Sequence, residues 1–270
     1  HVNRIMEIAM GCLIVAAHGD DISFPDRTEL TWQVWQRSRG KAASVMMGFV
    51  SFSDDASIPA REVPTPLIDL AAVIRRAGAC VVGASYAWHK RVFETFGPLP
   101  NYLHIEDIHI PFRSLLLGGI AFDPTPVCKY RQHIGNYLSP YHPDYRTPRG
   151  QQVWYQKKLT RHLAELRGFG EVLNKAVELG ILSRDEFSKH LVLISKMSAQ
   201  HQFQLDLMSP NLRHRLAAAV GLWRPGTFSD YSKKRKLFYL LASVSPSLGR
   251  LLYRFRVSHQ TGERSRNSRD

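Results

Sequence analysis

The 270-residue chain has few cysteines and no long apolar run. Its three cysteines, Cys12, Cys80 and Cys128, are widely spaced and form no CxxC pair, which argues against a disulfide framework and against a zinc site. Such cysteine usage fits a reducing cytoplasm. No stretch of about 18 or more uncharged apolar residues occurs, so the sequence predicts no transmembrane helix.

The chain also lacks an initiator methionine and a signal-peptide pattern at His1. We therefore expect residue 1 to lie inside a longer reading frame. With 44% hydrophobic and 10% aromatic residues, the composition lies far from that of disordered proteins. A chain of this length can bury a real core, and we expect one domain plus an appendage.

Acidic residues are scarce near the C-terminus, where much of the formal net charge of +13 lies. From Ser232 onward the chain has ten Lys and Arg residues against two acids. Such a block binds phosphates, in lipid headgroups or in nucleic acid. The segment 233–257 has the pattern of a basic amphipathic segment on an anionic membrane surface, although a solvated basic tail is the simpler alternative. Because no nucleic-acid-binding motif is present, we expect no nucleic-acid partner.

Hydrophobic periodicity predicts alternating helices and strands, followed by helices alone. Helices are expected at 2–10, 26–39, 67–76, 88–96 and 106–117, and strands at 12–17, 41–53, 80–86, 120–123 and 127–131. From about Pro148, helices are expected at 151–166, 171–179 and 184–208, the last with a capping box of Ser183 and Glu186. The pattern predicts an α/β domain over 1–147, a helical appendage over 148–224 and a basic amphipathic tail over 225–270 with a disordered end.

Two acidic segments lie at the ends of predicted elements: one follows a strand, and the other begins a helix. Asp20 and Asp21 come after the apolar run 12–17, which we expect to be a buried parallel strand, and ligands bind at the carboxyl ends of such strands. Adjacent carboxylates repel one another unless a cation lies between them and a partner. Mg²⁺ or Mn²⁺ holding a diphosphate would supply that cation. Glu106 and Asp107 begin a predicted helix.

These segments belong to an ordered series that resembles family 2 glycosyltransferases. The stretch Gly19-Asp20-Asp21-Ile22, with Pro25-Asp26-Arg27, is similar to the segment that carries the DxD-type metal motif of that family. The series continues in order through Gly83-Ala84-Ser85, Phe96-Gly97, Glu106-Asp107, Gly118-Gly119 and Tyr130-Arg131-Gln132-His133. The resemblance covers about residues 1–140 and implies the C-terminal part of a GT-A (nucleotide-diphospho-sugar transferase) domain.

The resemblance also implies a role for each matching residue. It implies Asp20 and His133 as metal-binding residues, Asp21, Gly83, Ala84 and Arg131 as donor-binding residues, and Asp107, with Glu106 beside it, as the catalytic base. The implied reaction is inverting transfer of a sugar from a nucleoside diphosphate sugar, with Mg²⁺ or Mn²⁺, to a hydroxyl of a glycan or lipid-linked acceptor. This reaction belongs to cell-envelope or extracellular polysaccharide synthesis, in the cytoplasm or at the inner face of the cell membrane.

The chain departs from the family pattern at two points. His18 stands where the commonest form of the motif has its first aspartate, and only seventeen residues precede it, although family members begin with βαβ units of roughly 30 residues each. We therefore expect the front units to be missing and this chain alone to bind nucleotide weakly and to lack activity. The alternative is a degenerate, non-catalytic relative that acts as a membrane-surface or phosphate-binding module.

Purely structural interpretations of these residues also stay open. An Asp-Asp pair in a loop is usually a turn or a helix cap, and Glu106-Asp107 is also typical of the acidic first turn of a helix. A lone histidine such as His133 is more often a hydrogen-bonded structural residue than a ligand.

Overall fold

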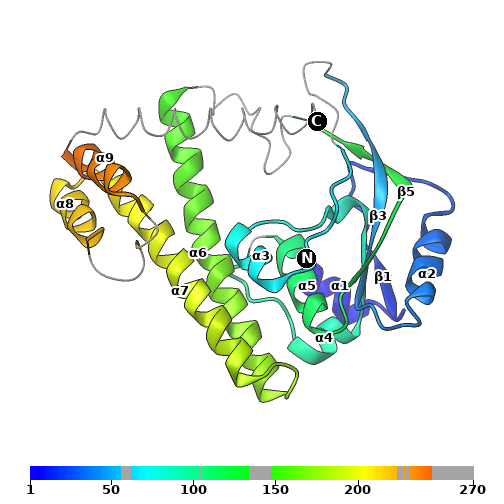
Figure 1. Cartoon of the computed structure of the whole chain (residues 1–270). Helices are drawn as coiled ribbons and strands as arrows, with labels where there is room; N and C mark the ends of the chain where they lie inside the picture. Colours follow the sequence, from blue (N-terminus) through cyan, green and yellow to red (C-terminus); the bar gives the residue numbers. More distant parts are fainter. Residues whose placement is uncertain (56–61, 104, 134–146, 224–227, 229–230, 245–270) are drawn as a thin grey trace. The chain divides into compact units, whose positions relative to one another are not determined.

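The structure, a computed structural model, describes residues 1–55, 62–103, 105–133, 147–223, 228 and 231–244 (Figure 1). Its elements are α1 (Val2–Ile8), β1 (Leu13–Val15), β2 (Ile22–Ser23), α2 (Arg27–Arg37), β3 (Ser44–Phe52), α3 (Leu70–Arg76), the 3-10 turn η1 (Gly83–Ser85), β4 (Tyr86–His89), α4 (Arg91–Phe96), α5 (Glu106–Leu116), β5 (Ile120–Arg131), α6 (Pro148–Glu178), α7 (Arg184–Leu207), α8 (Leu212–Gly221) and α9 (Lys233–Val244). The predicted α/β class is confirmed as a mixed fold.

The chain divides into two compact units. The first unit comprises His1–Tyr141 and Ala164–Met197, and the second comprises His142–Leu163 and Ser198–Asp270. Helices α6 and α7 each contribute residues to both units. The predicted boundaries at 147/148 and 224/225 stay predictions, and most of the predicted tail lies outside the described residues.

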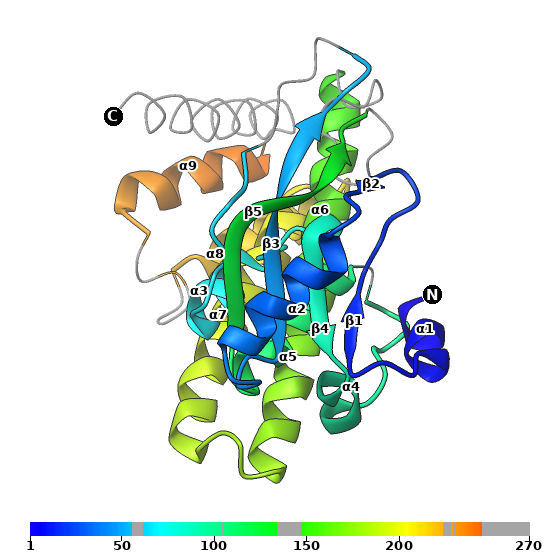
Figure 2. The ribbon, with the colours of Figure 1, turned by 90° about the vertical axis from the view of Figure 1, so that its right-hand side faces the viewer.

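The first unit contains a five-stranded sheet in the order β1-β4-β3-β5-β2 (Figure 2). Strands β3 and β5 are parallel, whereas β1, β4 and β2 each pair antiparallel with a neighbour. The prediction of a buried parallel strand at 12–17 was wrong. Only Leu13–Val15 is extended, it pairs with β4 at an edge of the sheet, and Ile14 is its one buried residue. The apolar run is long enough for a buried strand, but its single neighbour leaves its outer side unpaired.

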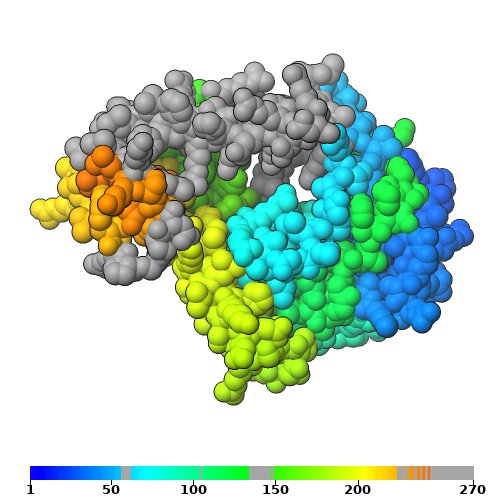
Figure 3. Space-filling model, viewed as in Figure 1, coloured from blue at the N-terminus to red at the C-terminus, as the bar shows by residue number. Residues whose placement is uncertain are grey.

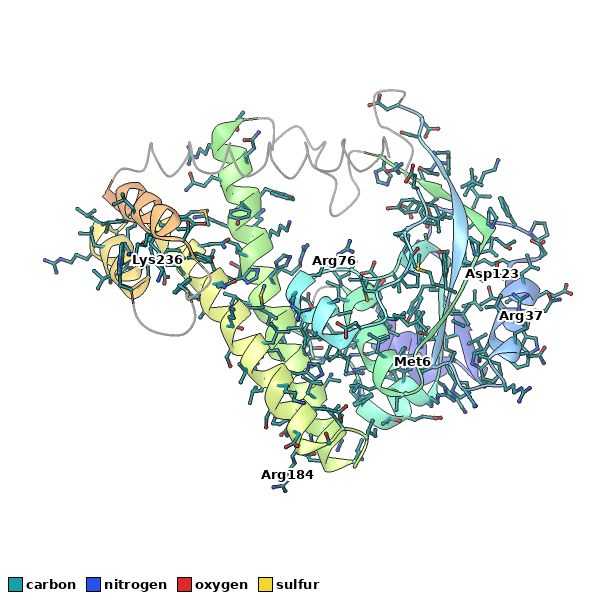
Figure 4. All side chains as sticks on the ribbon, in the orientation of Figure 1. Met6, Arg37, Arg76, Asp123, Arg184 and Lys236 are labelled. Atoms are coloured by element: carbon teal, nitrogen blue, oxygen red, sulfur yellow. The ribbon has the colours of Figure 1, made fainter. Side chains whose placement is uncertain are left out.

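Alternate residues of β3 contribute to two cores, as the period of an extended strand requires. Val45 and Met47 pack with Val34 of α2, and Figure 2 shows that helix lying across the sheet. Met46 points to the larger core on the other face, which contains Ile108 and Phe112 of α5. An ion pair at the surface joins Arg37 of α2 to Asp123 of β5. The two charged groups are 2.6 Å apart, and both residues are labelled in Figure 4.

Helix α5 is attached to α6 through a buried polar pair inside the first unit. His109 Nε2 donates to Glu165 Oε2 at 2.5 Å, and neither side chain is exposed. Burial lowers the pKa of His109, and the Glu165 carboxylate opposes that shift. Gly168 is required here, because a Cβ at this position would come into contact with the His109 ring. The pair and the Phe112–Phe169 stack therefore hold the helix that begins with Glu106 and Asp107.

Four predicted elements have different bounds in the structure. Residues 80–86 were predicted as a strand and Trp88 as the start of a helix, but Gly83–Ser85 form a tight 3-10 turn and Trp88 lies in β4. The turn is held by Ser85 Oγ, which donates to the carbonyl of Met47 at 2.7 Å. The two short strands predicted at 120–131 form one strand, β5.

The second unit has its own small core and a pair of short helices, α8 and α9. Phe203, Leu222, Phe228, Tyr231 and Tyr239 are buried together. The imidazoles of His162 and His201 lie 3.2 Å apart (Nδ1 to Nε2), and burial with the charge of His201 lowers the pKa of His162 to about 3. Among the described residues, no helix is long and apolar enough to span a membrane.

The helix start predicted at residue 183 is confirmed in the first unit. Ser183 Oγ accepts from the backbone N–H of Glu186, and the Glu186 carboxylate accepts from the backbone N–H of Ser183, both at 3.2 Å. This reciprocal pair is the predicted capping box, and it depends on local sequence alone.

Candidate active site

The loop after β1 is held against the end of β5 by Arg131. The backbone N–H of Arg131 donates to Asp21 Oδ1 at 2.9 Å, and its Nε donates to the carbonyl of Asp20 at 3.2 Å. Its guanidinium lies over the ring of Phe52, 4.6 Å from the centroid, and pairs with Asp54. One arginine therefore fixes both adjacent aspartates.

Asp20 faces solvent beside His133. His133 Nε2 lies 3.1 Å from Asp20 Oδ2, and each side chain is nearly half exposed. Partial burial opposes ionisation of Asp20, but the hydrogen bond from His133, a backbone hydrogen bond and the charges of His133 and His18 together outweigh it, so the pKa of Asp20 lies below its ordinary value. Asp20 is therefore a carboxylate near neutral pH, with an imidazole beside it.

Asp21 occupies the opposite environment. Its side chain is only 2% exposed, and its Oδ2 is buried without a hydrogen-bond partner. Burial raises the pKa of Asp21, opposed by the hydrogen bond from the N–H of Arg131 and reinforced by the charge of Asp20. A buried carboxylate oxygen that lacks a donor is costly, and a donor or cation from a ligand would relieve that cost.

Gly83 joins this loop to the first turn of α5. A Cβ built on Gly83 would lie 2.8 Å from His18 Cε1 and 3.7 Å from Asp107 Oδ2. Because no side chain stands at residue 83, the His18 ring and the Asp107 carboxylate can both come close to the same backbone. Asp107 also begins a helix, where the dipole favours a negative charge.

His18 lies between the two acidic segments. Its Nε2 is 3.6 Å from Glu106 Oε1, and its Nδ1 is 3.8 Å from Asp21 Oδ2. The Glu106 carboxylate raises the pKa of His18 against the effect of partial burial, and His18 in turn lowers the pKa of Glu106. The residue that departs from the family motif therefore places an imidazole with a raised pKa among the carboxylates.

The side chain of Arg27 connects two of the loops that form this region. Its buried guanidinium donates to the carbonyls of Ala16 and Ala84, the latter at 2.7 Å, and to Ser23 Oγ at 2.9 Å. Ala16 directly follows β1 and Ala84 lies in the Gly83 turn, so a single side chain joins the two loops. The carbonyl of Ala84 also accepts from the buried thiol of Cys128 at 3.4 Å.

Cys80 is not a candidate nucleophile. Burial, reinforced by the charge of Asp107, raises the pKa of Cys80 to about 12. The thiol therefore stays protonated at neutral pH, and only the thiolate is a good nucleophile.

Few of the described side chains could coordinate a divalent metal in this region. Among the described residues, no group of three or more His, Cys, Asp or Glu side chains could hold a metal ion. Asp20 Oδ2 and His133 Nε2 remain as two adjacent donor atoms, which fits an ion that takes one or two protein ligands and completes its shell with substrate phosphates. The residues fit a shared metal–diphosphate site and not an all-protein cage.

The structure brings the eight predicted site residues into one connected region. The connections run from His133 to Asp20, from Arg131 to Asp20 and Asp21, from His18 to Asp21 and Glu106, from Gly83 to His18 and Asp107, and from Ala84 through Arg27 to Ala16. Their catalytic and binding roles stay predictions. Sequence reasoning missed the contacts made by Arg27 and by Asp54.

Gly83→Ala tests whether the absence of a side chain at residue 83 matters. The new Cβ would displace the His18 ring, so we expect the sugar transfer that is proposed below to fall roughly tenfold, since small misplacements at a site cost one to two orders of magnitude. The measurement is release of nucleoside diphosphate. Gly170→Ala is the matched control, because nothing lies within 4 Å of a Cβ built there. Full activity of Gly83→Ala would show that residue 83 does not line the site.

Fold and site together define a mixed α/β protein with carboxylate-bearing loops gathered around the end of a central sheet. No family model matches the chain, and no curated protein matches it. Among solved structures, it is similar to the crystal structure of S. aureus TarS, residues 1–349, with a TM-score of 0.41 and 8% sequence identity over 96% of this chain and 70% of that chain. Because a TM-score below 0.5 does not establish a shared fold, the function must be argued from the site itself.

Proposed function

We propose that this chain belongs to an inverting glycosyltransferase, which moves a sugar from a nucleoside diphosphate sugar to an acceptor hydroxyl. The observation that carries the proposal is the convergence of four segments far apart in sequence, 18–21, 83–84, 106–107 and 131–133, on one region. Chance loop contacts would not select the segments that the family resemblance names. We propose a glycan or lipid-linked acceptor of cell-envelope or extracellular polysaccharide synthesis on the resemblance alone.

Asp107 is the proposed general base. Its carboxylate takes the proton of the acceptor hydroxyl while the acceptor oxygen attacks the anomeric carbon of the sugar. The bond from that carbon to the diphosphate oxygen breaks, and its electron pair leaves with the nucleoside diphosphate. A single displacement from the opposite face inverts the anomeric centre. Gly83 and Ala84 let the sugar approach the backbone closely, since neither has a long side chain.

Asp20, Asp21, Arg131 and His133 are the proposed donor-binding residues. Asp20 and His133 would hold Mg²⁺ or Mn²⁺, which when bound supplies positive charge to the leaving diphosphate. The buried Oδ2 of Asp21 can accept a hydrogen bond from a sugar hydroxyl. Arg131 keeps both aspartates in place through its backbone N–H and its Nε.

The test is release of nucleoside diphosphate from a panel of sugar nucleotides. We expect one donor to be consumed with Mg²⁺ or Mn²⁺ and activity to be lost in a chelator. Asp20→Ala should lower the rate by roughly 100-fold or more, because the metal supplies several kcal/mol of charge stabilisation.

Asp123→Asn is the matched control, because this carboxylate of β5 pairs with Arg37 and lies outside the site. It should keep the wild-type rate. Turnover that persists in the chelator would refute the metal role of Asp20 and His133. A folded protein that consumes no donor would refute transferase activity and favour the non-catalytic relative, a membrane-surface or phosphate-binding module.

A further inference from the structure

The formal charge of the chain is divided unequally between the two units. The second unit has 18 Lys and Arg residues against 5 Asp and Glu residues, which leaves +13, the net charge of the whole chain. The first unit has 18 of each and is neutral. The region with the candidate active site thus has no net charge, and the second unit alone attracts anionic surfaces over distances of about a Debye length.

Helix α8 in that unit has an exposed apolar stripe. Leu212, Leu216, Val220 and Trp223, spaced four, four and three residues apart, lie on one side of the helix and its C-terminal turn. Their exposed fractions are 47%, 38%, 64% and 54%. Isolated exposed apolar residues are normal, but four in one row that end in a tryptophan mark a contact surface.

The stripe is not the face that packs inside the unit. Arg215 and Ala219 of α8, with Leu222 just after it, are buried. The Arg215 guanidinium donates to the carbonyl of Ser243 in α9 at 2.9 Å and to the carbonyls of Ser209 and Pro210. These contacts fix the rotation of α8, so that the buried side borders the stripe while the stripe residues themselves stay exposed. Figure 3 shows α8 and α9 (yellow and orange) at the surface of the molecule.

Basic residues occur on the same two helices. Arg213 of α8 is exposed beside Leu212, Lys233 is exposed at the start of α9, and Lys236 of α9 is labelled in Figure 4. Leu237 of α9, 54% exposed, adds a further apolar side chain. Apolar residues with a tryptophan next to lysines and arginines are typical of helices that lie in the interface of an anionic bilayer.

We propose that the α8 stripe inserts into an anionic lipid bilayer surface, with the basic residues of the second unit over the headgroups. A nucleic acid would also attract the charge, but its phosphate backbone gains nothing from four exposed apolar side chains. A protein partner could bury the stripe but would not need a charge of +13 confined to the same unit. Of these three partners, only an anionic bilayer binds both the apolar stripe and the positive charge. The proposal does not depend on glycosyl transfer.

The test is sedimentation of the full chain with vesicles of phosphatidylcholine, with and without an equal amount of phosphatidylglycerol. We expect binding only to the anionic vesicles. The triple variant Leu216→Ser/Val220→Ser/Trp223→Ser should weaken that binding roughly tenfold or more, because each buried CH₂ contributes measurably to membrane affinity. A blue shift of fluorescence on binding should be lost in Trp223→Phe, which removes the only tryptophan of the stripe.

The matched control is Ile68→Ser/Leu191→Ser/Val192→Ser, which removes three exposed apolar side chains from the neutral first unit. It should bind as the wild type does. Wild-type binding by the α8 variant, or equal affinity for duplex DNA and anionic vesicles, would overturn the proposal in favour of a simple polyanion-binding surface. Absence of vesicle binding would overturn it too. The α8 variant should keep the wild-type release of nucleoside diphosphate, so failure here is distinguishable from failure of the proposed reaction.

Discussion

Asp107→Asn is expected to lower the rate of sugar transfer by roughly 10²–10⁴-fold, the range that a positioned general base contributes. Asparagine keeps the size of the side chain and its place at the start of α5, but it cannot take a proton. The loss of one charge from the helix N-terminus costs only about 0.3–1 kcal/mol, so the variant should fold. The measurement is the single-turnover rate of nucleoside diphosphate release at saturating donor and acceptor, together with the unfolding midpoint.

Glu106→Gln is the matched control for this prediction. Glu106 is the neighbouring acid in the same helix turn, and its carboxylate lies 3.6 Å from His18. We expect a smaller loss of rate, since the proposed base is Asp107 and Glu106 lies against the His18 imidazole. If Asp107→Asn keeps the wild-type rate, Asp107 is only an acidic first-turn residue. If Glu106→Gln has the larger effect, the assignment of the base was wrong by one residue.

Arg27→Leu is expected to destabilise the first unit by about 3 kcal/mol. The substitution leaves the carbonyls of Ala16 and Ala84 without their charged donor, and each buried polar group left unsatisfied costs about 1–3 kcal/mol. The loop after β1 and the Gly83 turn should also separate, so donor affinity should fall together with stability. Urea unfolding followed by far-UV circular dichroism measures the first effect, and donor titration measures the second.

Arg37→Leu in the same helix separates this effect from the mere loss of an arginine. Arg37 makes an exposed ion pair with Asp123, and such pairs contribute about 0–1 kcal/mol. We expect its unfolding midpoint and donor affinity to stay close to wild type. Equal destabilisation by the two substitutions would show that the buried contacts of Arg27 carry no special stability.

Local sequence was sufficient for the elements whose signals are short-range. Helix α2 was predicted at 26–39 and α5 at 106–117, within two residues of their observed ends, because apolar spacing and flanking caps act within a few turns. The capping box of Ser183 and Glu186 was predicted for the same reason. The long strand β3 also lies within its predicted range, since two faces need apolar residues in alternation.

Elements that depend on partners far away in sequence were predicted less well. The run 12–17 is apolar enough for a central parallel strand, but only its pairing with β4, more than 70 residues later, makes Leu13–Val15 an antiparallel edge. From local sequence, Gly83 was predicted to lie in a strand. In the structure, the nearby His18 ring requires that residue 83 has no side chain. No local signal distinguishes these outcomes, because the free energy that decides them comes from contacts between distant segments.

The candidate site divides in the same way. The sequence by itself determined which residues are the candidates, the carboxylates at 20, 21, 106 and 107 with Arg131 and His133, because ordered motifs place these residue types at set intervals. Only the tertiary structure decided their environments: Asp20 exposed beside His133, Asp21 buried, and His18 between the acids. It also decided that Arg27 joins two loops 68 residues apart through its bonds to Ala16 and Ala84. Burial and hydrogen bonding set charge and orientation, and both arise only when segments distant in sequence pack together.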